Sequence, residues 1–182
     1  MPVPAGRTAA YRLPAVSRPV ATRRPVGRLR CRTATTGSRY GVHLELYAAR
    51  LVVPVPAGIG IAPPQRRRGA DVLGGACVYP LWTTEPTGVI VVDRGLQSRD
   101  RSVRSRGGRG LPPTLGELFA VWGQPLSRGR LAGFRGPVRA FLGGARWTGP
   151  PQAIPLTPHA EIVLEVGGAI PPHRTYLFPP GL

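Results

Sequence analysis

Three histidines and eight acidic residues are the side chains in this 182-residue sequence whose types could hold a metal ion. His43, His159 and His173 show neither the HxH nor the HExxH spacing that places two imidazoles on one metal. Together with Glu45 they form a candidate ligand set, but the sequence assigns no metal site and predicts no cofactor. The acidic residues are too few and too scattered to nominate a pair of catalytic carboxylates.

No segment carries a recognisable catalytic motif. There is no nucleophile elbow, and the Gly-containing turns GGRG and GIGI lack the strand, lysine or helix context of a phosphate-binding loop. We therefore predict no catalytic residue. Trp82 is flanked by turn residues and is the candidate for a ligand contact at the surface, whereas Trp122 is expected in the core.

Cys31 and Cys77 are the only cysteines. Neither belongs to a CxxC pair, which argues against a cysteine-ligated zinc. In an exported chain they would meet an oxidising compartment and have no other cysteine to pair with, so we predict one intramolecular disulfide. Two unrelated thiols are the alternative.

The chain is strongly basic, with a net charge of +17. All 25 basic residues are arginine, which indicates a GC-rich gene rather than selection for an anionic partner. The arginines gather in residues 1–40, 66–68 and 99–109, and these runs lack the aromatic interleaving expected of single-strand binding. We interpret them as solvated segments, and weak binding to nucleic acid or an anionic surface is the alternative.

Residues 1–39 contain frequent prolines, no acidic residue and no apolar run of the length that a signal peptide requires. We expect a disordered basic arm or a wrongly assigned start. Order is expected to begin near Tyr40, and residues 40–182 are expected to form a single domain. No stretch of the sequence approaches the length of a transmembrane helix.

The spacing of apolar residues predicts two β-hairpins and two further strands. The hairpins cover residues 42–55 and 138–148, the second with a Gly-Gly turn. Residues 87–93 are apolar on both faces and predict a buried strand, and residues 160–166 predict the last strand.

One helix is predicted over residues 114–122. Thr114 and Glu117 match a capping box, and apolar residues recur at helical spacing up to a terminating glycine. Exposed loops are expected near residues 65–76 and 95–112. The predicted fold class is α+β, with a mixed or antiparallel sheet and one packed helix in an arrangement that could resemble a β-grasp.

Four segments, VPAGIGIAPP, EPTGVIVVD, TLGELFAVWGQPLSRGRLAGF and YLFPPGL, resemble an uncharacterised family of exported, lipoprotein-like proteins from high-GC bacteria. The resemblance covers roughly residues 40–182 and implies an extracytoplasmic location without an established activity. Members often carry several histidines near the first hairpin and before the TGVI strand. Here only His43 remains in the first region and residues 81–84 contain none, which argues against carrying over a metal site.

These observations favour a non-enzymatic interaction or structural module, secreted or associated with the cell envelope, whose partner could be an envelope component. Nucleic acid is not expected as a specific partner. Two other classes stay open as alternatives: weak nucleic-acid or anionic-surface binding through the arginines, and a metal-binding protein or metal-dependent enzyme.

Overall fold

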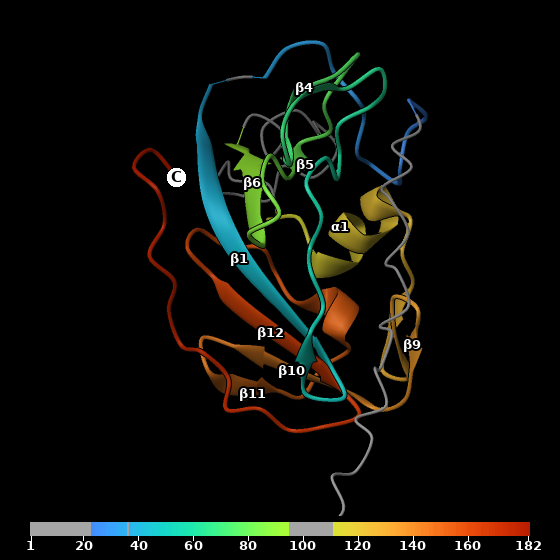
Figure 1. Cartoon of the computed structure of the whole chain (residues 1–182), viewed down its shortest axis with the longest axis vertical. Helices are drawn as coiled ribbons and strands as arrows, with labels where there is room; N and C mark the ends of the chain where they lie inside the picture. The colour runs from blue at the N-terminus through green and yellow to red at the C-terminus, as the bar shows by residue number, and fades with distance from the viewer. Residues whose placement is uncertain (1–22, 36, 95–110) are drawn as a thin grey trace, which may run out of the picture.

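The computed structural model of the protein describes residues 23–35, 37–94 and 111–182. Over these residues the chain is mostly β, with one short α-helix, as Figure 1 shows. Its centre is a mixed seven-stranded sheet, and two small antiparallel sheets accompany it.

The central sheet has the strand order β11 (Ala145–Trp147), β10 (Val138–Leu142), β12 (Glu161–Val166), β1 (Arg39–Ala48), β6 (Val89–Asp93) and β5 (Leu81–Trp82). The short strand β2 (Leu51–Val52) also pairs with β1. The small sheets are the hairpin of β3 (Arg66–Arg68) and β4 (Asp71–Gly74), and the meander of β7 (Leu126–Ser127), β8 (Arg130–Leu131) and β9 (Phe134–Arg135). The helix α1 (Leu115–Trp122) precedes the meander, and a 3-10 helix, η2 (Pro151–Ala153), precedes β12.

One face of the central sheet forms the main hydrophobic core against α1. Apolar side chains alternate along the strands because successive residues of a strand point to opposite faces. The buried core residues contributed by β1, β12 and α1 include Val42, Leu44, Leu46, Ile162, Leu164, Leu118, Phe119 and Trp122. In Figure 1, α1 lies on one side of this sheet, and the segment that follows β12 runs along the other.

The structure confirms the predicted strands and helix. Residues 89–93 form the fully buried strand β6, and residues 161–166 form β12. The second hairpin turns at Gly143 and Gly144, both with positive φ. The first hairpin also forms, but its second strand is only the two residues of β2, because Pro54 follows closely and has no N–H to donate.

Two boundaries differ from the sequence-based expectations. Residues 66–74 were expected within a loop but form the hairpin β3–β4, since the fully buried Val72 anchors β4 and donates its backbone N–H to Thr84. Order also begins before Tyr40, because Leu29 is buried in the main core and Arg32 pairs with Val78. Of the other predicted segments, residues 1–22 and 95–110 lie outside the described residues.

We expect Thr114→Ala to lower the free energy of unfolding by about 1 kcal/mol, the usual value of an N-cap. The Thr114 hydroxyl accepts from the backbone N–H of Glu117, and the Glu117 carboxylate accepts from the backbone N–H of Thr114. Urea unfolding should show this loss, and Thr114→Ser should keep most of the stability because serine also caps. Equal losses for both variants would contradict a capping role.

Candidate functional site

The face of the central sheet opposite the core carries polar residues at its centre. His43, Glu45 and Tyr47 alternate with the core residues of β1 and therefore share this face. The parallel pairing of β1 with β12 sets His43 beside Glu161 and Tyr47 beside Glu165. Two strands from opposite ends of the described chain thus bring an imidazole and carboxylates together.

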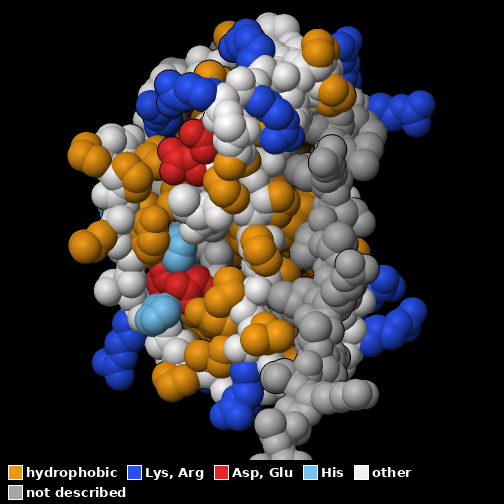
Figure 2. All heavy atoms as spheres, viewed as in Figure 1, with side chains coloured by type: hydrophobic (Ala, Val, Ile, Leu, Met, Phe, Trp, Pro, Cys, Tyr) orange, Lys and Arg blue, Asp and Glu red, His pale blue; other side chains and the backbone are white. Residues whose placement is uncertain are grey.

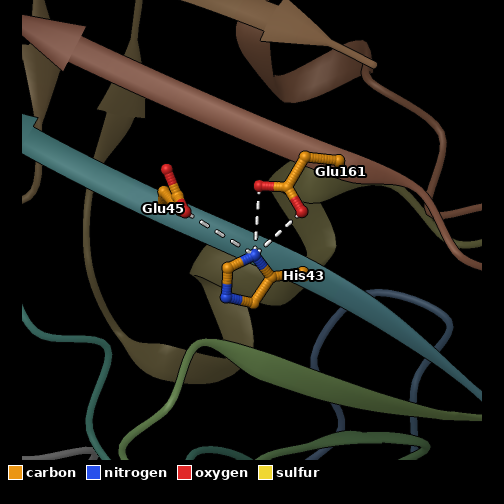
Figure 3. Close-up of side chains that lie close together, drawn as sticks. All are labelled: His43, Glu45 and Glu161. Carbon is orange, nitrogen blue, oxygen red and sulfur yellow. Dashed lines mark hydrogen bonds and ion pairs between the residues drawn. The ribbon is translucent and has the colours of Figure 1, made fainter. Parts of the chain in front are cut away.

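His43 is the centre of this arrangement (Figure 3). Its side chain is 6% exposed, and its Nδ1 lies 2.8 and 3.0 Å from the two carboxylate oxygens of Glu161, which is 1% exposed. The Oε1 atom of Glu45 lies 4.0 Å from the same Nδ1. The other ring nitrogen, Nε2, lies 3.1 Å from the backbone carbonyl oxygen of Thr87.

Both ring nitrogens of His43 lie beside oxygen atoms that act as acceptors. A backbone carbonyl can only accept, so Nε2 carries a proton and donates it to Thr87. In a neutral imidazole, Nδ1 would then direct its lone pair at the carboxylate of Glu161, which also only accepts. A proton or a metal ion between His43 and Glu161 removes this conflict.

Glu45 is held from two sides. The Tyr47 hydroxyl donates to its Oε2 at 3.0 Å, and His173 Nδ1 lies 2.8 Å from Oε1 and 2.9 Å from Oε2. Burial, the hydrogen bond to Glu45 and the nearby carboxylates raise the pKa of Tyr47 to about 12. Tyr47 therefore stays a neutral donor at physiological pH.

The donor atoms of His43, Glu45 and Glu161 are close enough to share one metal ion. One atom from each residue lies within 4.8 Å of the others. Ligands about 2.1 Å from a tetrahedral zinc lie about 3.4 Å from one another, so small side-chain movements suffice. The Nε2 contact of His43 with a backbone carbonyl is the second hydrogen bond that commonly fixes a metal-binding histidine.

A cleft of about 220 Å³ adjoins this cluster. It opens on the edge of β1 away from β12, between the part of β1 that pairs with β6 and the part that pairs with β2. Its lining combines polar groups of β1 with apolar side chains. The lining residues include His43, Glu45, Tyr47, Val52, Val55 and Pro86. Figure 2 shows histidine side chains against acidic ones on this face, bordered by hydrophobic side chains.

The structure brings together only part of the ligand set considered from the sequence. His43 and Glu45 belong to the cluster, and His173 contacts Glu45 from the segment after β12. His159 instead contacts the backbone oxygen of Leu182. Among the described residues, the group of side chains close enough to share a metal contains only one of the three histidines.

Glu161 is the residue that the sequence analysis missed. No pair of catalytic carboxylates could be nominated from the sequence, and the structure brings Glu45 and Glu161 together beside His43. A signal was present, because Glu161 occupies a strand that is otherwise almost entirely apolar, and a charged residue in such a strand needs a partner. Its partner could not be read from the sequence.

The other residues singled out from the sequence are structural. Cys31 and Cys77 form a disulfide, with 5.4 Å between their Cα atoms. Trp82 is only 7% exposed and packs with Val72 and Val91, so its expected role as a surface contact is wrong. Trp122 is fully buried in the main core, as predicted.

The arginine runs contribute no contact to the cluster in the part of the chain that the structure describes. Residues 66–68 are exposed on β3, and residues 99–109 lie outside the described residues. Binding to nucleic acid or an anionic surface therefore stays a hypothesis.

No helix among the described residues has the length and apolar character that crossing a bilayer requires. Comparison of the chain with family profiles, curated proteins and solved structures gave no match.

Proposed function

We propose that this protein is an extracytoplasmic domain that binds a divalent transition-metal ion through His43, Glu45 and Glu161. The observation that carries the proposal is the position of His43 Nδ1, which faces the carboxylates of both glutamates while Nε2 is engaged by the Thr87 carbonyl. A metal ion at Nδ1 would satisfy all three side chains at once.

The electrostatics of the cluster support this proposal. Among the described residues, no arginine forms an ion pair with Glu45 or Glu161, although the chain contains 25 arginines. The neighbouring Glu165, by contrast, lies 2.9 Å from an Arg139 nitrogen. Both carboxylates depend on histidine for a basic partner, Glu161 on His43, and Glu45 on His43 and His173. Buried carboxylates are costly unless a cation accompanies them, which favours cation binding here.

The donor set points to a class of metal. Imidazole nitrogen suits Zn²⁺, Cu²⁺, Ni²⁺ and Fe²⁺ better than Mg²⁺ or Ca²⁺, which prefer sites built from oxygen alone. With three protein ligands, a tetrahedral ion keeps one position for water or another ligand. We infer Zn²⁺ as the first ion to test.

An extracytoplasmic location is supported by the disulfide between Cys31 and Cys77, since disulfides persist in oxidising compartments. The resemblance to exported proteins points the same way. The polar face of β1 and β12 would then belong to an extracytoplasmic binding module, in line with the interaction role proposed from the sequence.

Titration calorimetry of the purified, tag-free chain with Zn²⁺ tests the proposal. We expect one site per chain, and Glu161→Gln should weaken binding by about 100-fold or more, because even outer contacts of metal ligands contribute about 10- to 100-fold. The matched control is Glu117→Gln on α1, which changes the same chemical group while glutamine retains the capping box.

The proposal predicts that Glu117→Gln binds Zn²⁺ like the unmodified chain. Absence of saturable binding to the unmodified protein would refute it. Equal binding by the unmodified chain and Glu161→Gln would also refute it, because the ion would then lie elsewhere.

A further inference from the structure

The segment that follows β12, residues 167–182, crosses the polar face of the sheet without forming a strand of its own. We call it the C-terminal strap. Figure 1 shows it running from the end of β12 along the side of the sheet opposite α1. Near its start, the Ile170 backbone N–H donates to the buried carboxylate of Glu165 at 3.0 Å.

Two residues of the strap contact the candidate metal site. His173 contacts both carboxylate oxygens of Glu45, and the Tyr176 ring stacks on His43 with 3.7 Å between ring centroids and 14° between planes. Phe178 packs edge-on against Tyr176. Gly41 of β1 admits this ring, because a Cβ there would lie 2.6 Å from a Phe178 ring carbon.

Glu45 is the ligand that most needs such support. Its side chain is 19% exposed, whereas those of His43 and Glu161 are 6% and 1% exposed. Tyr47 donates to its Oε2, and His173 reaches both of its oxygens from the strap. These donors fix the carboxylate with Oε1 nearest to His43 Nδ1.

We propose that His173 is a positioning residue of the metal site and that docking of the C-terminal strap is coupled to metal binding. This inference rests on the proposed function, because it concerns the same site. The Nδ1–H of His173 orients Glu45, and Tyr176 covers the imidazole of His43. Coupling is reciprocal, so a docked strap strengthens metal binding and a bound metal holds the strap in place by the same factor.

Three full-length variants test the role of His173 through their Zn²⁺ affinity. His173→Ala removes the donor, and we expect it to weaken binding about 10-fold, as for other outer contacts of metal ligands. His173→Asn places an amide N–H close to the former Nδ1 and should restore most of the affinity. Leu177→Ala is the control within the strap, because this side chain is 95% exposed.

The Co²⁺-substituted protein provides a readout that a purely structural role would not change. We expect His173→Ala to alter the visible absorption spectrum of bound Co²⁺, because Glu45 is no longer held in one orientation, and His173→Asn to resemble the unmodified protein. Equal loss of affinity in both variants would overturn the positioning role, because asparagine retains an N–H that can donate to Glu45.

Trypsin cleavage after Arg174 tests the reciprocal effect. Release of the peptide covering residues 175–182, followed by mass spectrometry, should slow about 10-fold with saturating Zn²⁺. Glu161→Gln should show no such protection, because it lacks the site.

The outcomes separate the two proposals. If the unmodified chain binds Zn²⁺ and Glu161→Gln does not, the proposed metal site is confirmed. In that case, an unchanged Zn²⁺ affinity of His173→Ala, together with a rate of trypsin cleavage after Arg174 that does not depend on Zn²⁺, overturns the coupling and leaves the metal site in place. If the unmodified chain binds no Zn²⁺, both proposals fail.

Discussion

Phe119→Ala is expected to lower the free energy of unfolding by about 3–5 kcal/mol, the usual cost of removing a buried phenyl ring from a core. Phe119 is 1% exposed and lies in the main hydrophobic cluster, with its ring centroid 5.3 Å from that of Trp122. Because α1 has only eight residues, it cannot be stable without this packing. Urea unfolding followed by circular dichroism measures the loss.

Ala120→Gln on the same helix is the matched control, because Ala120 is exposed. We expect a change of no more than about 0.5 kcal/mol, as for surface substitutions in general. A loss for Phe119→Ala as small as that of the control would show that α1 is not docked on the sheet.

Removal of the disulfide between Cys31 and Cys77 is expected to lower the free energy of unfolding by about 2–4 kcal/mol. The bridge closes a loop across a sequence separation of 46 residues and so restricts the unfolded chain. It also ties the segment that contains Leu29 to the strands, beside the paired backbones of Arg32 and Val78. Unfolding with and without reductant should show the difference.

The double variant Cys31→Ser/Cys77→Ser is the control for the reductant itself, and its stability should not change when reductant is added. The intact mass of oxidised protein should be lower by two hydrogens than that of reduced protein. Two free thiols in protein recovered from the cell envelope or medium would contradict the bridge and weaken the case for an extracytoplasmic location.

Local features of the fold could be predicted because their causes are local. The capping box of Thr114 and Glu117 and the positive φ of Gly123 define both ends of α1 within ten residues. The Gly143–Gly144 turn likewise depends only on the conformational freedom of glycine. Such features form between neighbours in the chain, so the sequence alone indicates them.

Two expectations about which residues are buried were wrong. Trp82 lies among turn residues, which suggested exposure, yet β5 pairs with β6 and places this ring in a second apolar cluster. The segment before Tyr40 was expected to be disordered from its composition, but Leu29 fills part of the core. Both outcomes depend on distant residues that composition does not reveal.

The sequence by itself determined part of the secondary structure: the alternation along β1, the buried strand β6 and the helix α1. It also supplied two cysteines for one bridge. It also determined that His43, Glu45 and Tyr47 share one face of a strand, because side chains alternate along extended backbone. These properties follow from the backbone conformation of short segments.

The tertiary structure alone decided that β1 pairs in parallel with β12. The paired residues His43 and Glu161 are 118 residues apart in the sequence. A one-residue shift in this register would turn Glu161 to the opposite face and separate it from His43. The C-terminal strap then adds His173 and Tyr176 from a still later segment. The candidate site exists only after folding, because its donors come from separate segments that the packing of the whole sheet holds in register.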